Sequence, residues 1–146
     1  MARFLLISAW LALLLSGCGD SAAQKEIRMN DKKTTVLAAK MQLVLPPNAV
    51  ILGIRETNGL DNSAFLKVQF DKDQWDQFLD ASPLRSEEFS DERRYLLGPN
   101  DGWWDPERPK VLPTAQAHLA EGKVLNMGVD QSDTSKVVVY LMWHET

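Results

Sequence analysis

Apolar and polar residues follow several distinct patterns along the chain, and the first is a strongly apolar stretch near the amino terminus. Residues 4–15 are apolar at every position except Ser8, and Arg3 gives the segment a positive start. A membrane-spanning helix needs about 20 consecutive apolar residues. This shorter run therefore has the layout of a cleaved export signal, which we assign to residues 1–17.

The next segment is polar and predicts a tether. Between residues 19 and 35 the only large apolar side chains are Ile27 and Met29. A segment with so little apolar surface cannot order itself by burial. We expect residues 18–35 to form a flexible tether and residues 36–146 to form a single small domain.

The domain opens with a pattern at helical spacing. Leu37, Met41 and Val44 repeat at that spacing within residues 36–45, which favours a short helix over the alternative of a strand. Thr34-Thr35 are candidate N-caps. Pro46-Pro47 lack amide hydrogens and are expected to end the element.

A hairpin is predicted next. Residues 49–54 are apolar and partly β-branched, residues 59–63 have turn composition, and residues 64–70 alternate. The apolar positions on one side of the second strand are Ala64, Leu66, Val68 and Phe70.

A second helix is expected to begin at Asp71. This residue is a favourable N-cap, and Gln74, three residues later, completes a capping box. Trp75, Phe78 and Leu79 then form a narrow apolar face. Ser82-Pro83 should end the helix.

The carboxyl-terminal part indicates two strands, residues 114–128 and 135–144, around a turn that contains Asp130 and Asp133. Residues 137–143 are apolar at every position, which is typical of a central strand covered on both faces. The predicted fold class is α+β, with an antiparallel sheet of about four strands and one main packing helix.

Composition and charge exclude several classes of function. The chain has 16 Lys+Arg against 20 Asp+Glu, a formal charge of −4, and no basic block. A nucleic-acid-binding role is not expected, because phosphate recognition requires a basic surface. A single cysteine also excludes a disulfide scaffold and a cysteine-based zinc site.

That cysteine carries a resemblance to bacterial lipoproteins. The residues Leu15-Ser16-Gly17-Cys18 match the lipobox of that class. The resemblance implies cleavage before Cys18, a diacylglyceryl thioether on its sulfur and an acylated new amino terminus. The alternative is an ordinary cleaved signal followed by an incidental cysteine.

The residue after Cys18 bears on location. In enteric lipoproteins an Asp at this place retains the protein in the inner membrane, whereas this chain has Gly19. For a source with two membranes, the resemblance therefore implies a lipid-anchored protein of the outer membrane that faces the periplasm. No cofactor other than this covalent lipid is expected, and no metal site.

Catalytic motifs are sparse. The glycines form neither a dinucleotide fingerprint nor a P-loop, and no Gly-x-Ser-x-Gly motif occurs. His118 and His144 are the only imidazoles, on what we predict to be opposite strands of a hairpin, where they could be neighbours. An envelope hydrolase that uses one of them is one alternative function.

Residues 98–109 form the most unusual segment. Pro99-Asn100-Asp101-Gly102 predicts a tight turn, and Trp103 and Trp104 follow it. An outward indole suits a sugar, a peptide or a protein partner. Our hypothesis makes this segment the binding edge, with Trp103 and Trp104 as its aromatic groups and three charged residues beside them: Asp101, Asp105 and Arg108. The alternative is that both indoles only cap the core.

Together these features predict a membrane-anchored, non-enzymatic binding module of the cell envelope, with an envelope protein or a glycan as its partner. Besides the hydrolase, one more alternative stays open. An immunity or inhibitor lipoprotein against a toxin or a lysozyme would also suit an acidic chain, because its target would be basic.

Overall fold

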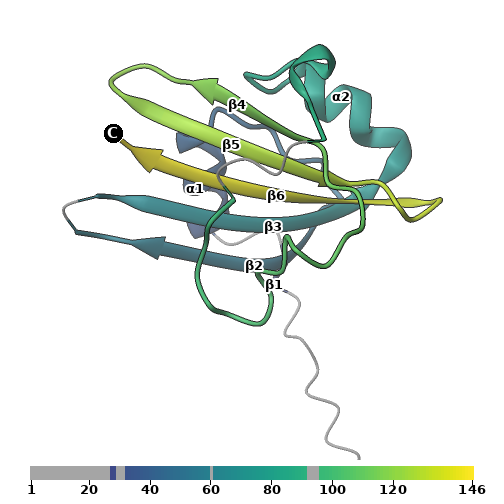
Figure 1. The fold of residues 1–146 in the computed structure, drawn as a ribbon, viewed down its shortest axis with the longest axis horizontal. Coiled ribbons are helices and arrows are strands. Elements are labelled where there is room, and N and C mark those ends of the chain that lie inside the picture. The colour runs from purple at the N-terminus through teal and green to yellow at the C-terminus, as the bar shows by residue number, and fades with distance from the viewer. Residues whose placement is uncertain (1–26, 29–31, 60, 92–95) are drawn as a thin grey trace, which may run out of the picture.

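A six-stranded antiparallel sheet forms the centre of the computed structural model (Figure 1). The structure describes residues 27–28, 32–59, 61–91 and 96–146. The expected export signal, Cys18 and most of the tether lie outside these residues. Within them, no helix has the length and apolarity needed to cross a bilayer.

The strands run in the spatial order β1-β2-β3-β6-β5-β4. Their bounds are β1 Ile27–Arg28, β2 Val50–Thr57, β3 Ser63–Asp71, β4 Thr114–His118, β5 Lys123–Asp130 and β6 Lys136–Glu145. The helices are α1 Lys32–Lys40 and α2 Trp75–Asp80, with short 3₁₀ turns η1 Lys72–Gln74 and η2 Ser86–Glu88.

The predicted hairpin is confirmed, because β2 and β3 pair antiparallel. On β3 the four alternating apolar residues are all buried on one face of the sheet. The central-strand prediction is also confirmed, since β6 lies between β3 and β5. Its odd-numbered residues from Val137 to Trp143 face the helices, and Tyr140 belongs to a separate cluster on the other face.

The two faces are covered by different kinds of structure. Both helices contribute to the larger core, through Leu37 and Met41 of α1 and through Phe78 and Leu79 of α2. Irregular chain covers the opposite face: residues 96–113, here called the cover loop, cross the front of the sheet (Figure 1). The apolar part of this sheet face is thus covered by irregular chain.

The sheet has more strands than predicted because the single strand predicted for residues 114–128 is two strands, β4 and β5. A tight turn at Glu121-Gly122 separates β4 from β5, with φ angles of 61° and 70° at these residues. Backbone hydrogen bonds between Leu119 and Lys123 of 2.7 Å, and between Lys123 and Ala120 of 3.4 Å, close the turn. The two-residue β1 adds the sixth strand, and α1 is a second packing helix.

The first helix begins and ends earlier than the sequence indicates. It starts at Lys32, so Thr34 is buried inside it rather than capping it. It stops well before Pro46, because Gln42 adopts a left-handed φ of 57°. The Leu43 amide donates to the Ala38 carbonyl at 2.9 Å and the Gln42 amide to Ala39 at 3.0 Å, which is a Schellman ending.

The capping role predicted for Asp71 is wrong, although a helical segment does follow it. The Asp71 side chain makes no cap hydrogen bond. Its carboxylate instead accepts a 2.6 Å hydrogen bond from Lys136, which lies directly opposite it in the β3–β6 register. A cross-strand cation is thus the partner of this carboxylate, and a 3₁₀ turn separates Asp71 from α2.

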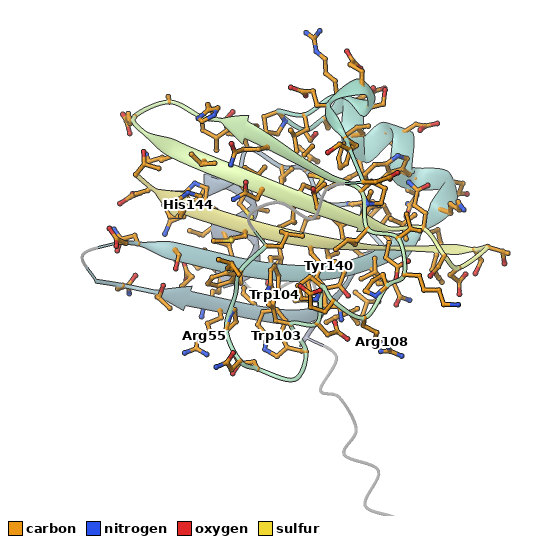
Figure 2. The ribbon with its side chains drawn as sticks, viewed as in Figure 1. Arg55, Trp103, Trp104, Arg108, Tyr140 and His144 are labelled. Atoms are coloured by element: carbon orange, nitrogen blue, oxygen red, sulfur yellow. The ribbon has the colours of Figure 1, made fainter. Side chains whose placement is uncertain are left out.

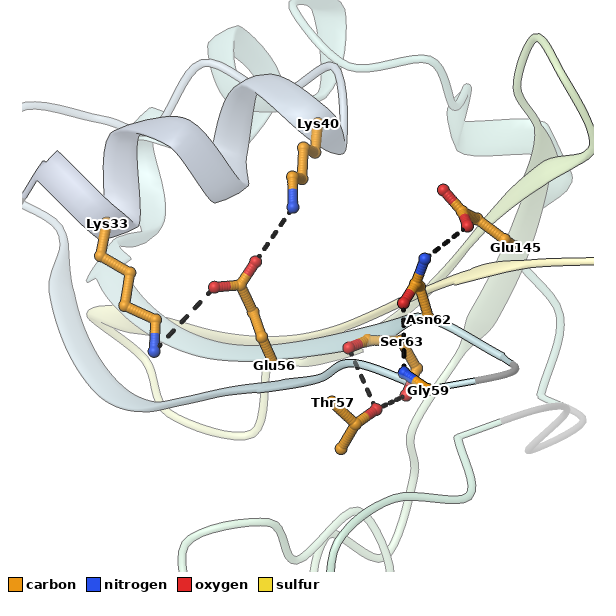
Figure 3. Close-up of polar contacts among 8 residues, drawn as sticks. All are labelled: Lys33, Lys40, Glu56, Thr57, Gly59, Asn62, Ser63 and Glu145. Atoms are coloured by element: carbon orange, nitrogen blue, oxygen red, sulfur yellow. Dashed lines mark hydrogen bonds and ion pairs between the residues drawn. The ribbon is translucent and has the colours of Figure 1, made fainter.

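Polar contacts tie α1 and the hairpin ends to the sheet (Figure 3). Lys40 of α1 lies 3.2 Å from the Glu56 carboxylate, and Lys33 lies 4.0 Å from it. At the β2–β3 turn, the Asn62 amide donates to Glu145 at 2.8 Å. The contacts of α1 with Glu56 lie on the sheet face opposite the cover loop, and the Asn62–Glu145 contact lies at the end of the sheet.

Candidate functional site

The indole of Trp103 lies flat against β2. A Cβ placed on Gly53 would come within 2.0 Å of Cδ2, 2.1 Å of Cε3 and 2.7 Å of Cγ of this ring. Because these three atoms adjoin one another in the ring plane, the face of the indole covers the glycine. Any side chain at position 53 would collide with the indole. The absence of a side chain at Gly53 is therefore what allows the ring to pack against β2.

Trp104 is part of the core beneath the cover loop. It is 7% exposed, and its indole nitrogen donates to the Leu96 carbonyl at 3.2 Å. Its ring packs edge to face against Phe65 at 5.3 Å, against Tyr140 at 5.6 Å and against Trp103 at 5.7 Å between centroids. Such pairs are stabilising beyond their buried area.

The tight turn lies two residues later than predicted. The Trp104 amide donates to the Asp101 carbonyl at 2.9 Å, which closes a turn over residues 101–104. This turn brings both indoles onto the same sheet face, so they do not point to opposite sides as an extended pair would. Trp104 fills the core and Trp103 stays half-buried.

Two acidic residues of the cover loop fasten it to the sheet. Asp101 accepts a 2.9 Å hydrogen bond from Arg55 of β2, and both side chains are largely exposed. Asp105 accepts hydrogen bonds from Lys67 of β3 and, at 2.9 Å, from the Tyr140 hydroxyl of β6. Neither carboxylate is free to act as an isolated charge.

Lys67, Asp105 and Tyr140 form a compact polar cluster under the loop. Lys67 is only 8% exposed, and its ammonium group lies 4.9 Å from the centroid of the Tyr140 ring. Burial raises the pKa of Tyr140 well above its usual value, and the hydrogen bond to Asp105 raises it further. Tyr140 is therefore a neutral donor, and the cluster is one ion pair with a hydroxyl attached.

Arg108 extends away from this cluster. Its guanidinium lies 3.7 Å from the second Asp105 oxygen, and its side chain is 83% exposed. Figure 2 shows Arg108 and Arg55 on opposite sides of the group formed by Trp103, Trp104 and Tyr140. Lys67 and Arg108 thus share one carboxylate, which leaves an excess positive charge at the outer guanidinium.

A cleft of about 1040 Å³ opens beside the cover loop. Trp103, Arg108 and residues 109–111 form its loop wall, and Lys67, Gln69 and Tyr140 form its sheet wall. It continues past Asp130, at the end of β5, to Trp75 and Phe89, which stack edge to face at 5.9 Å. This volume is at the upper end of the range typical of ligand sites.

The structure places the five predicted binding residues in two groups. Trp103 and Arg108 line the cleft, whereas Trp104, Asp101 and Asp105 hold the cover loop in place. Sequence reasoning missed Lys67, Gln69 and Tyr140 as cleft residues. Lys67 and Gln69 lie on the same face of β3 as the apolar Phe65. An apolar residue on an otherwise polar strand face indicates that this face is covered, and this was the signal in the sequence.

The two histidines are not brought together. His118 of β4 and His144 of β6 both pair with Val124 of β5, so a strand lies between them. Two interstrand spacings separate their backbones by about 10 Å. His144 also lies toward one end of the sheet, away from Trp103 and Trp104 (Figure 2). The prediction that they lie on the two strands of one hairpin is wrong, because the missed turn places β5 between β4 and β6.

The donor chemistry of the described residues does not assemble a metal centre. Over residues 27–28, 32–59, 61–91 and 96–146, no group of three or more His, Cys, Asp or Glu side chains is placed to hold an ion. What the cleft offers is an aromatic surface, a guanidinium, an amide and a carboxylate. Each of these groups can hold a ligand, by stacking, hydrogen bonding or ion pairing.

Comparisons with protein-family models, with curated protein sequences and with solved structures find no match to this chain.

Proposed function

We propose that this protein is a lipid-anchored, non-enzymatic binding module of the bacterial cell envelope, and that it takes its ligand in the cleft beside Trp103. The observation that carries the proposal is the position of Trp103. Its indole is partly exposed, lines the cleft and is seated against Gly53 of the sheet. A rigid aromatic surface of this kind suits recognition, because little conformational entropy is lost on binding.

The surroundings of Trp103 support preorganisation. The Asp101–Arg55 pair fastens the cover loop on one side of the indole, and the Asp105–Lys67 pair fastens it on the other. Trp104 anchors the loop between them. Contacts of this kind hold a binding site in a fixed geometry. They therefore support a binding role for the cover loop over a purely structural one.

The anchor is proposed from the lipobox residues. Cys18 is followed by eight residues before β1 begins at Ile27. At about 3.3 to 3.6 Å per residue, these eight residues span at most about 30 Å. A lipid on Cys18 would therefore keep the cleft close to the membrane surface, which we propose to be the periplasmic face of the outer membrane in a source with two membranes.

Cys18→Ser tests the anchor. Expression in a bacterium that processes lipoproteins should give wild-type protein that partitions into detergent and is recovered with membranes. The variant should be recovered in the aqueous phase, and globomycin should block processing of the wild type only. If the variant and the wild type partition alike, the anchor is wrong, whatever the cleft binds.

Photo-crosslinking in intact envelopes tests the cleft. A photoreactive residue in place of Val111, an exposed residue of the cleft wall, should capture a partner. Capture should be lost in Trp103→Ala and weakened in Arg108→Ala. Val44→Ala and Arg85→Ala change exposed residues outside the cleft and serve as matched controls. Undiminished capture by both cleft variants would place the binding surface elsewhere.

A further inference from the structure

We propose that the ligand of the cleft is an acidic oligosaccharide, with a sugar ring stacked on the Trp103 indole and a sugar carboxylate paired with Arg108. The inference rests on the proposed function, because it names the chemical class of the ligand for the same cleft. Three features of the described residues carry it: the indole surface, the planar polar side chains around it and the distribution of charge.

The first feature is the orientation of Trp103. One face of its ring is covered by Gly53 and Trp104 packs edge to face against the ring, so its exposed part belongs to what remains of the opposite face and the edges. Within the part of the chain that the structure describes, its indole nitrogen has no hydrogen-bond partner and is not among the buried unpaired atoms. A flat apolar face with an adjacent donor matches a sugar ring, whose faces carry C–H groups and whose rim carries hydroxyls.

The second feature is the set of planar polar side chains that line the cleft. Among the described residues, the Gln69 side-chain amide makes no hydrogen bond, so both its donor and acceptor atoms are available. Asp130 uses its Oδ1 to accept the Ser132 amide at 2.9 Å and retains Oδ2. Neighbouring sugar hydroxyls each donate and accept, which suits amides, carboxylates and guanidinium groups with paired polar atoms.

The third feature is the charge of the cleft wall. Lys67 and Arg108 are two cations that share the Asp105 carboxylate, and Tyr140 adds a neutral hydroxyl to the same group. Within this group, the positive charge that Asp105 does not neutralise is on the exposed guanidinium of Arg108, and Lys110 and Asp130 add one charge of each sign to the cleft lining. A guanidinium pairs bidentately with a carboxylate, which favours an acidic sugar over a neutral one.

The size and lining of the cleft agree with a short chain of sugars. A volume of about 1040 Å³ exceeds that of a single sugar ring, and a second aromatic pair, Trp75 and Phe89, lies farther along the lining. An acidic peptide would also pair with Arg108, and its backbone N–H and C=O groups can pair with Gln69 and Asp130, but its backbone presents no flat face of C–H groups to the Trp103 indole. A hexaglutamate peptide and acidic and neutral oligosaccharides distinguish these two ligand classes.

The experiment is a calorimetric titration of the intact lipoprotein in detergent micelles with three named probes: tetragalacturonic acid, a neutral galactose tetrasaccharide and a hexaglutamate peptide. Tetragalacturonic acid should bind at least tenfold more tightly than the neutral sugar, and hexaglutamate should not bind at millimolar concentration. Binding should also change the tryptophan fluorescence of the wild type.

Two variants assign the contacts. Arg108→Gln changes an exposed side chain, so it should fold normally and should reduce affinity for the acidic sugar about tenfold while leaving the neutral sugar unaffected. Trp103→Ala should lose both sugars. Arg85→Gln, an exposed residue outside the cleft lining, is the matched charge control and should behave as the wild type.

Equal affinity for acidic and neutral sugars, or equal binding of hexaglutamate, would overturn the inference. Failure of both sugars to bind at millimolar concentration, combined with Trp103-dependent crosslinking in envelopes, would overturn the glycan inference and leave the proposed function intact. If neither sugar binds and crosslinking does not depend on Trp103, both the glycan inference and the proposed binding function of the cleft are overturned.

Discussion

The indole ring of Trp103 rests face-on upon the Cα of Gly53, so the position of a partly exposed tryptophan is determined by the absence of a side chain on the neighbouring strand. Gly128 on β5 has a similar role, since a Cβ there would come within 2.6 Å of Leu96 and 3.3 Å of Leu112. The cover loop is thus seated in two depressions that glycines leave in the sheet. The rigidity of the cleft wall follows from this fit.

Gly53→Ala should displace Trp103 and destabilise the domain by about 1 to 3 kcal/mol, the usual range for overpacking. The reason is that the new methyl group would overlap the indole ring, whose other contacts limit its movement. Chemical denaturation followed by tryptophan fluorescence measures both effects. Gly102→Ala is the control in the same loop, because no atom lies within 4 Å of its added Cβ, and it should change stability by less than about 0.5 kcal/mol.

Asp105→Asn should destabilise the domain far more than Asp101→Asn. The first substitution leaves Lys67, which is 8% exposed, without its anionic partner, and should cost about 2 to 4 kcal/mol. The second removes a pair whose side chains are 46% and 38% exposed, which contributes at most about 1 kcal/mol. Urea unfolding of the two variants checks the order, and similar losses would argue against the buried clamp.

Tyr140 should make stability fall with pH above about 10. Burial raises the pKa of Tyr140 above its ordinary value of 10.0, so the folded state keeps a proton that the unfolded chain releases. The contribution of Tyr140 to folding stability is therefore fully present below pH 10. As the pH rises from 10 toward the raised pKa of the folded state, this contribution falls by about 1.4 kcal/mol per pH unit. Denaturation from pH 8 to 11 should show a shallower decline for Tyr140→Phe, and parallel curves would refute the assignment.

Glu121→Asn should stabilise the β4–β5 hairpin by about 0.5 to 1 kcal/mol. Both Glu121 and Gly122 have positive φ, and asparagine adopts that conformation with less strain than glutamate in two-residue hairpin turns. Thermal unfolding monitors the gain. Glu121→Ala is the control: it also removes the contact with Lys123 but supplies no left-handed preference, so a gain in that variant would contradict the turn geometry.

Elements whose partners are near in sequence could be predicted from local pattern. The β2–β3 hairpin and its alternating buried face followed from period-two apolarity and a turn-rich segment. The central place of β6 followed from its unbroken apolar run. The β4–β5 turn did not, because Glu121 is a poor residue for positive φ, and its neighbour Gly122 gave only a weak signal.

The candidate site was predictable in part for the same reason. The unusual composition of residues 98–109 drew attention to Trp103 and Arg108, both of which line the cleft. Nothing local in the sequence distinguished them from Trp104 or Asp105, which hold the loop. That division depends on contacts with Gly53, Lys67 and Tyr140, residues distant along the chain.

The sequence by itself determined the α+β class, the β2–β3 hairpin and the lipobox resemblance, because periodicity and short motifs depend on residues close together in the chain. Only the tertiary structure decided that irregular chain seals the second sheet face, that Asp105 joins Lys67 to Tyr140, and that β5 separates the two histidines. These features depend on the strand order and on where a glycine leaves room for the Trp103 indole. Both are determined by pairing between segments that are distant in the chain.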